Sequence, residues 1–182
     1  MTARLPSGTR AFVLTVSDGV AAGVREDASG AALAERLEAL GAIVERAVVV
    51  DDIAGIAAAV RAATAMHSLV VTTGGTGLTP RDVTPQAVAT VLDYTIPGFG
   101  EAMRAAGRAG TPLADLSRSG AGVCGRVLVI SVPGSPRGAL ESLEAIVPLL
   151  AHALQTLAGP WDHDAARRRP AAAYDPVEEE PR

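Results

Sequence analysis

The chain of 182 residues carries a formal net charge of −4, and 48% of its residues are hydrophobic although only 3% are aromatic. This length suits one domain with a large aliphatic core, and arginines scattered along an acidic chain exclude a nucleic-acid-binding footprint. All 16 basic residues are arginine, so the absence of lysine also excludes a Walker-type phosphate loop and Schiff-base chemistry.

Runs of β-forming apolar residues alternate with helical patterns along most of the chain. In chain order the sequence predicts a strand at 11–16, a helix at 30–40, a strand at 43–50, a helix at 53–65, a strand at 69–72, a helix from 84–85 to about 92, a helix within 97–110, a strand within 125–131 and a last helix from the turn at 133–136 to about 157. This alternation predicts an α/β fold, with parallel strands and helices on both faces of the sheet. The near-continuous valine and isoleucine runs agree, because strands of such a sheet are buried on both sides.

Single residues mark where the predicted helices begin, bend and end. Ser29 is predicted to cap the first helix and Gly41 to end it. Thr84 is a predicted N-cap, followed by Pro85 at the first helical position. Pro148 lies inside the last helix and should kink or restart it.

Beyond Gly159 the periodic pattern disappears and arginine, alanine, proline and acidic residues are mixed. The sequence therefore predicts one domain at 10–158 and a disordered tail at 159–182. Residues 1–10 lack the apolar segment of a secretory signal, and no apolar run has the length of a membrane span. The expected location is the cytoplasm.

Polar residues and glycines follow the predicted strands, at the sheet edge where ligands of open parallel sheets bind. The residues delivered there are Ser17 and Asp18, Asp51 and Asp52, the loop Gly74-Gly75-Thr76-Gly77, and Pro133-Gly134-Ser135. All four sets fall on one edge if the strands are parallel. Their convergence predicts the place of a binding site.

The glycine loop has two interpretations. Gly74, Gly75 and Gly77 permit positive φ angles and close approach of the backbone to a ligand. Successive backbone N–H groups, together with the hydroxyl of Thr76, could then hold a phosphate. The same pattern suits an ordinary tight turn, and the glycines alone do not decide between the two.

The acids beside this loop are equally ambiguous when taken singly. Asp51 and Asp82 precede predicted helices, so each could be a cap or compensate a helix dipole. Together they fit a magnesium–phosphate site, because Mg²⁺ takes one or two carboxylates and leaves its other positions to phosphates and water. Ser17 and Asp18 could bind a polar ligand or form a turn, and residues 117–119 could bind phosphate or form a solvated loop.

A longer motif surrounds the glycine loop. It reads TTGGTG from Thr72 and continues as PRDVTP from Pro80 to Pro85. Earlier and later motifs follow in order, at 15–18, 27–30, 96–98, 116–118 and 132–136. Between about residues 10 and 158 the chain resembles the Mog/MoaB family of molybdenum-cofactor synthesis.

The resemblance implies a three-layer α/β/α sandwich around a mostly parallel sheet, assembled as a homotrimer. It also implies ATP- and Mg²⁺-dependent adenylylation of molybdopterin. In that reaction the terminal phosphate of molybdopterin attacks the α-phosphorus of ATP, and pyrophosphate leaves. The molybdenum-inserting enzyme of the same pathway is a further implied partner.

By position, the resemblance also assigns roles to single residues. Asp51 and Asp82 match catalytic carboxylates and metal ligands. The residues implied to contact the nucleotide are Gly74, Gly75, Thr76, Gly77, Ser117, Arg118, Ser119, Ala121, Pro133, Gly134 and Ser135. Those implied to contact molybdopterin are Thr15, Ser17 and Asp18.

The chain departs from the family pattern at Ser131, where asparagine is frequent, and at Gln86, where glutamate is usual. These departures leave open an alternative, a MoaB-like paralogue that binds molybdopterin without turnover. A dinucleotide-binding dehydrogenase is disfavoured, because the loop lacks the Gly-x-Gly-x-x-Gly spacing and does not open a helix directly.

Overall fold

The computed structural model describes residues 4–159, so the predicted tail beyond Gly159 lies outside the described residues. One sheet of six strands, in the order β2-β1-β3-β6-β5-β4, forms the centre. The strands are β1 (Arg10–Val16), β2 (Ile43–Val49), β3 (Leu69–Thr73), β4 (Tyr94–Thr95), β5 (Gly120–Cys124) and β6 (Val127–Val132). β2, β1, β3 and β6 are parallel, whereas β5 runs antiparallel to β6 and β4 antiparallel to β5. The predicted mostly parallel sheet is confirmed.

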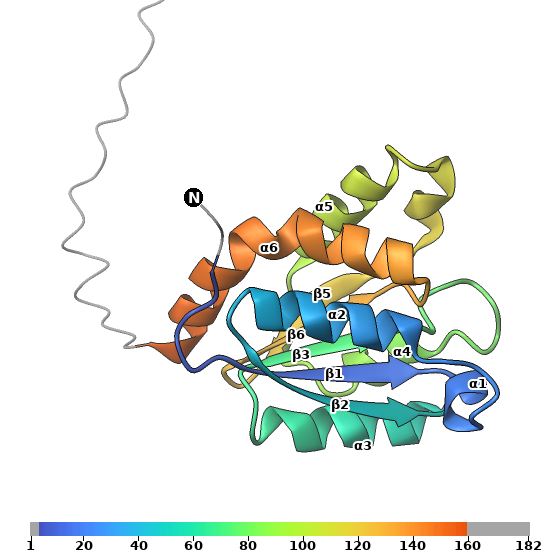
Figure 1. The fold of residues 1–182 in the computed structure, drawn as a ribbon, viewed down its shortest axis with the longest axis horizontal. Helices are drawn as coiled ribbons and strands as arrows, with labels where there is room; N and C mark the ends of the chain where they lie inside the picture. The colour runs from blue at the N-terminus through green and yellow to red at the C-terminus, as the bar shows by residue number, and fades with distance from the viewer. Residues whose placement is uncertain (1–3, 160–182) are drawn as a thin grey trace, which may run out of the picture.

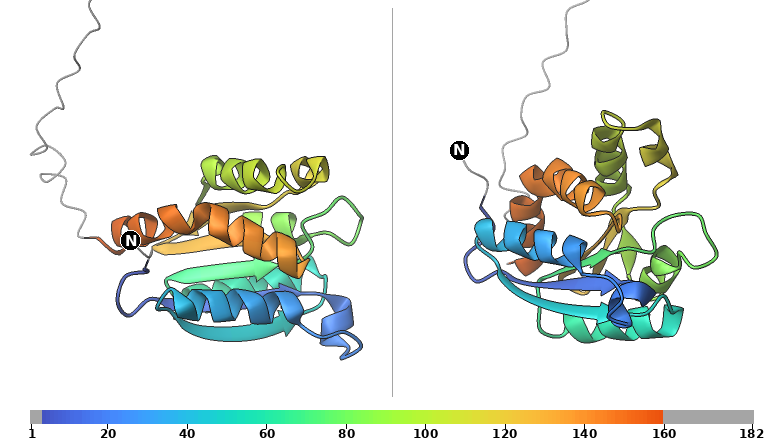
Figure 2. Two further views of the ribbon diagram at one scale, coloured as in Figure 1. Left: turned by 45° about the horizontal axis from the view of Figure 1, so that its top comes forward. Right: turned by 45° about the vertical axis from the view of Figure 1, so that its right-hand side comes forward.

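Helices cover both faces of this sheet (Figures 1 and 2). They are α1 (Asp18–Ala21), α2 (Ala28–Ala39), α3 (Ile53–Thr64), α4 (Thr84–Ala89), α5 (Pro97–Gly107), the 3₁₀ helix η1 (Pro112–Leu116) and α6 (Pro136–Ala158). α2, α5 and α6 pack in the core of one face, and α3 and α4 pack in that of the other. The arrangement is the three-layer α/β/α sandwich that the resemblance implies.

The two faces of the sheet are built by alternation along each strand. Val13 and Ile130 join the core under α2, α5 and α6, whereas their neighbours Leu14 and Val129 join the core under α3 and α4. All four side chains are fully buried. Each contributes on the order of 1.5–3 kcal/mol by leaving water. This core is mostly aliphatic, and Phe99 is the aromatic residue among its buried side chains between residues 4 and 159.

The structure corrects several predicted element boundaries. The N-cap of α2 is Asp27, whose carboxylate accepts from Gly30 N at 2.9 Å, whereas Ser29 lies buried inside the helix. α4 has Val83 at its N-cap position, because the hydroxyl of Thr84 donates to Gly74 O instead of capping the helix. Gly41 ends α2 as predicted, with a φ of 97°.

α6 is continuous from Pro136 to Ala158, so of the two effects predicted at Pro148, a kink or a restart, the restart does not occur. Ile146 and Leu150, on either side of the proline, are fully buried in the core. Their burial offsets the lost hydrogen bond at Pro148, which costs about 3 kcal/mol. None of the helices between residues 4 and 159 combines the length and apolarity that crossing a membrane requires.

The sequence reading missed α1, β4 and β5. α1 has only four residues and β4 only two, which is too short for a periodic pattern. β5 contains Gly120 and Gly122, which lower its apparent strand propensity. A two-residue connection that includes Gly125, with φ of 59°, joins β5 to β6, and this hairpin turn was the signal that could have revealed the strand.

Candidate functional site

The carboxyl ends of the four parallel strands meet at one edge of the sheet. Figure 1 shows this edge at the right, where β1 and β2 point toward α1 and the loop after β3 projects beyond the sheet. The segments that follow these strands, at 17–18, 51–52, 74–77 and 133–135, are those predicted from the sequence to lie at the binding edge. The predicted convergence is therefore confirmed at the level of the backbone.

The first cavity at this edge has a volume of about 770 Å³. It is lined by Thr15, Val16, Ser17, Val20, Arg25, Glu26, Ala28, Ser29, Asp51, Thr73, Gly74, Gly75, Gly134, Ser135 and Pro136. α2 and α6 both begin at its wall, and the N-termini of helices favour anions. The cavity can therefore accept a polar, negatively charged small molecule.

A second cavity, of about 510 Å³, adjoins the first. It is lined by Gly75, Thr76, Gly77, Leu78, Asp82, Leu113, Leu116, Ser117, Pro133 and Gly134. Gly75 and Gly134 line both cavities, so these two glycines form a shared wall. Asp51 lines the first cavity and Asp82 the second.

Asp51 is fixed by a reciprocal pair of hydrogen bonds with Asp18. Asp18 N donates to Asp51 Oδ2 at 3.0 Å, and Asp51 N donates to Asp18 Oδ1 at 3.1 Å. Partial burial, and then the negative charge of Asp82, raise the pKa of Asp51 above its ordinary value. The influence of Asp82 places the two carboxylates within electrostatic range of each other.

Asp82 is held in its ionised form by its own loop. Its Oδ2 accepts hydrogen bonds from Thr79 N at 2.8 Å and from Thr79 Oγ1 at 2.6 Å. The bond from the Thr79 side chain is the largest cause that lowers the pKa of Asp82; the backbone amides of Thr79 and Gly77 and the charge of Arg118 lower it further. The electrostatic repulsion between the two carboxylates therefore raises the pKa of Asp51, because Asp51 is the less well stabilised of the two.

The opposite pKa directions predict opposite effects on stability. Asp51→Asn keeps the acceptor for Asp18 N but removes a charge that folding disfavours, so at pH 7 its Tm should equal or exceed that of the wild type. Asp82→Asn removes a charge that folding favours, so its Tm at pH 7 should be lower.

The pH dependence of thermal stability tests the direction of both pKa shifts. A raised pKa for Asp51 means that wild-type stability is lost as pH rises through that pKa, so any advantage of Asp51→Asn should grow from about pH 4 to pH 7. The deficit of Asp82→Asn should also grow over this range, because the stabilisation from a lowered pKa is lost only on acidification. Thermal unfolding in a metal-free buffer measures both, and a lower Tm for Asp51→Asn at pH 7 would contradict the assignment.

The glycine loop fits between the strand ends because Gly74 and Gly75 have no side chains. Gly74 and Gly75 have positive φ angles of 101° and 62°, as the sequence predicts, whereas Gly77 does not have a positive φ. A Cβ atom on Gly74 would lie 2.2 Å from Val16 O, and one on Gly75 would lie 2.4 Å from Thr84 Oγ1 and 3.4 Å from Asp51 Oδ1. The loop backbone therefore lies directly against β1, α4 and the Asp51 carboxylate.

Two of the three residues predicted to contact molybdopterin line the first cavity, and the third does not. Thr15 and Ser17 line the first cavity, but the Thr15 hydroxyl already donates to Asp27 at 2.8 Å and Ser17 Oγ accepts from Val20 N. Asp18 does not line that cavity. Its carboxylate instead accepts from Asp51 N and forms an ion pair with Arg81.

Three predicted nucleotide contacts lie apart from the two cavities. Arg118, Ser119 and Ala121 line a smaller hollow of about 220 Å³ between α4, α5 and β5. Ser117, which lines the second cavity, shares a hydrogen bond of 2.8 Å with Ser119 through their hydroxyls. The remaining predicted contacts, at 74–77 and 133–135, lie on the walls of the two cavities.

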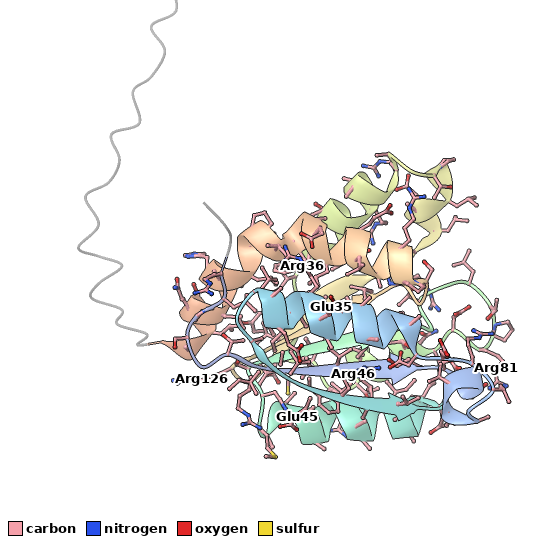
Figure 3. All side chains as sticks on the ribbon, in the orientation of Figure 1. Glu35, Arg36, Glu45, Arg46, Arg81 and Arg126 are labelled. Carbon is pink, nitrogen blue, oxygen red and sulfur yellow. The ribbon has the colours of Figure 1, made fainter. Side chains whose placement is uncertain are left out.

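Sequence reasoning gave no role of their own to Arg81, Asp27 and Thr79. Figure 3 shows Arg81 at the α1 edge of the site, where it pairs with Asp18. Asp27 joins three elements, because it accepts from Thr15 on β1, from Arg46 on β2 and from the start of α2. Acidic side chains that hold neighbouring loops leave no distinctive pattern in a sequence.

No group of three or more His, Cys, Asp or Glu side chains among residues 4–159 could hold a metal ion by itself. Asp51 and Asp82 could supply two carboxylate ligands, and Mg²⁺ typically takes one or two carboxylates with phosphate and water as its other ligands. His67 is buried, and it contacts Ala63 O and the ring of Phe12. It belongs to the packing under α3.

Comparison with known protein sequences relates the chain to proteins of molybdenum cofactor biosynthesis. The pattern of a family described as a probable molybdopterin binding domain matches residues 12–152. A molybdenum cofactor biosynthesis bifunctional protein of Synechococcus elongatus is 44% identical over 163 residues, which cover 88% of this chain and 51% of that protein. A molybdopterin adenylyltransferase of Helicobacter pylori is 44% identical over 91 residues, 50% of this chain and 52% of that protein. The chain spans about half the length of these curated relatives.

Solved structures show the same likeness. MoaB from Thermus thermophilus, a molybdopterin biosynthesis enzyme, matches with a TM-score of 0.77 at 43% identity, over 84% of this chain and 99% of that one. The Mog protein from Mycobacterium ulcerans matches with a TM-score of 0.78 at 37% identity, over 82% and 99%. CinA from Thermoplasma acidophilum, at 23% identity and a TM-score of 0.62 over 79% and 98%, shares the fold alone.

Proposed function

The chain belongs to the Mog/MoaB family of molybdopterin binding domains, and on this premise we propose that it adenylylates molybdopterin with ATP and Mg²⁺. The observation that carries the proposal is that Asp51 and Asp82 each line one of two adjoining cavities, which share Gly75 and Gly134. A transfer between two bound substrates requires such a division, because each substrate needs its own pocket and the reacting groups must meet.

In this proposal molybdopterin occupies the first cavity, with Thr15 and Ser17 on its wall, and the nucleotide occupies the second. Gly74 N already donates to Val132 O, and the Gly77 amide faces Asp82, so the amides of Gly75 and Thr76 are assigned to the phosphates. Pro133 and Gly134 also line the second cavity. These groups position the phosphates without the lysine that the chain lacks.

Asp51 and Asp82 would hold Mg²⁺, which supplies positive charge where negative charge develops on the phosphates. The chain's own contribution is to keep Asp82 ionised through Thr79 and to orient Asp51 through Asp18. The reaction forms a bond between the terminal phosphate oxygen of molybdopterin and the α-phosphorus of ATP. The bond from the α-phosphorus to the oxygen that bridges to the β-phosphate breaks, and pyrophosphate leaves.

Incubation of the protein with molybdopterin, ATP and Mg²⁺ tests the proposal. Adenylylated molybdopterin and pyrophosphate should form in equal amounts, as measured by mass spectrometry and a pyrophosphate assay. Binding of molybdopterin without either product would instead identify the alternative, a binding paralogue. The two departures from the family pattern do not favour that alternative, because Ser131 bonds to Thr72 and Gln86 to Arg118, and neither lines the two cavities.

We also propose a homotrimer in the cytoplasm and a pathway partner that inserts molybdenum. The support for a partner is that a relative of about twice the matched length is described as a bifunctional protein of molybdenum cofactor biosynthesis. Light scattering coupled to gel filtration should give three times the mass of 18.4 kDa for the chain. A mass of one chain at micromolar concentration would refute the trimer.

A further inference from the structure

The guanidinium of Arg118 is directed at the protein backbone. Its Nε donates to Gly77 O at 2.8 Å, Nη2 donates to Asp82 O, and Nη1 donates to Gln86 Oε1 at 3.1 Å. The backbone N–H of Arg118 also donates to Thr76 O at 3.0 Å. All three guanidinium nitrogens are therefore committed to acceptors in the segment that carries Asp82.

We propose that Arg118 is a positioning residue that holds Asp82 at the site, and not a ligand of the nucleotide phosphates. This inference rests on the proposed function, which is what gives the place of Asp82 its importance. It departs from the role that the family resemblance implies for Arg118.

The contacts of Arg118 join the two ends of one loop. Gly77 is the last residue of the glycine loop and Asp82 lies shortly before α4, and residues 78–81 between them are exposed, with Leu78 at 64%. The loop is held internally by hydrogen bonds between Thr79 and Asp82, but it buries little surface that would order it further. A planar guanidinium that reaches both carbonyls closes the loop and fixes where its last residue, Asp82, can point.

A second arginine fixes the segment from which Arg118 extends. Arg104 on α5 donates through Nη1 to Ser117 O at 3.3 Å and to Ser119 O at 3.0 Å, the carbonyls on either side of Arg118. Gly100 makes room for it, since a Cβ there would lie 3.0 Å from both terminal nitrogens of Arg104 and 2.8 Å from Ser119 O. The two arginines therefore connect α5 to Asp82 through a continuous set of hydrogen bonds.

The position of Arg118 also disfavours a phosphate contact. Arg118 lines the hollow between α4, α5 and β5, whereas Asp82 lines the second cavity. Three of the five N–H groups of Arg118 donate to Gly77 O, Asp82 O and Gln86 Oε1, so moving the guanidinium into the second cavity would break the bonds to the two carbonyls. Those carbonyl groups would then lack a charged donor.

Three variants test the inference: Arg118→Lys, Arg118→Gln and, as a matched control, Arg108→Gln. Arg108 makes an exposed pair with Asp115, so its loss removes an arginine from the neighbouring elements without touching the loop. Amide hydrogen exchange of residues 76–83 is measured without ligands. Arg118→Lys and Arg118→Gln should each speed this exchange by about tenfold, and Arg108→Gln should not.

Two ligand measurements separate positioning from phosphate binding. ATP affinity without divalent metal should stay within about twofold of wild type, whereas the Mg²⁺ concentration for half-maximal pyrophosphate release should rise by about tenfold. Arg118→Lys should restore neither the wild-type exchange rate of residues 76–83 nor the wild-type Mg²⁺ requirement, because a point charge cannot bond three separated acceptors.

Two results would overturn the inference: unchanged exchange at 76–83 in Arg118→Gln, or a metal-free ATP affinity that falls about tenfold in Arg118→Gln and returns in Arg118→Lys. A wild-type protein that makes no pyrophosphate would reject the proposed function instead. In that case the exchange measurement still decides whether Arg118 orders the loop.

Discussion

Asp82→Asn is expected to reduce the rate of pyrophosphate release by about 1,000-fold or more, because it removes one of the two carboxylates that are proposed to hold Mg²⁺. Asparagine keeps an oxygen that can accept from Thr79 N, so the loop should remain folded. The measurement is turnover with molybdopterin and ATP at saturating Mg²⁺, with a thermal melt of the same sample. Asp51→Asn should cause a loss of similar size.

The matched control is Asp52→Asn, one residue from Asp51. Asp52 is the N-cap of α3, where its carboxylate accepts from Gly55 N at 2.7 Å, and it does not line either cavity. Asparagine is also a good N-cap, so both stability and turnover should stay near wild type. Turnover of Asp82→Asn within about tenfold of wild type, in folded protein, would refute the metal assignment.

Gly74→Ala is expected to destabilise the protein by about 4 kcal/mol, which lowers Tm by roughly 10 °C. Two effects add at this position. The φ of 101° is unfavourable for any residue with a side chain, and the new Cβ would lie 2.2 Å from the carbonyl oxygen of Val16. That oxygen belongs to the end of a buried strand and cannot move without disturbing the sheet.

Gly41→Ala separates the two effects. Gly41 has a similar φ of 97°, but a Cβ there meets nothing within 4 Å. Its cost should be the backbone strain alone, about 1–2 kcal/mol. Chemical denaturation of both variants measures the difference between them, which is the contribution of the contact with β1. Equal losses would mean that the glycine turn is not held against Val16.

The parts of the site that follow from strand order were predictable from the sequence. A parallel sheet must bring its carboxyl ends to one edge, so Asp51, Gly74 and Gly134 could be placed together from hydrophobic patterns alone. The positive φ of Gly74 and the end of α2 at Gly41 also followed, because both depend on the residue type.

The parts that depend on hydrogen-bond partners were not predictable. Asp27 caps α2 in place of Ser29, and the structure gives its carboxylate two further donors, Thr15 and Arg46, from neighbouring strands. An arginine near a phosphate loop can bind an anion or a carbonyl group, and the sequence of residues 117–119 does not distinguish the two. The carbonyls of Gly77 and Asp82 that Arg118 reaches carry no signature in the sequence.

The place of β6 in the sheet has a consequence for biosynthesis. β6 lies between β3 and β5, and Thr73 Oγ1 donates to Pro133 O across 60 residues of chain. When the chain up to the loop after β3 has left the ribosome, the glycine loop has been synthesised. The residues after β6 that line the same two cavities have not. Pairings of such long range form late, so a nascent chain would complete the two adjoining cavities only when β6 joins the sheet.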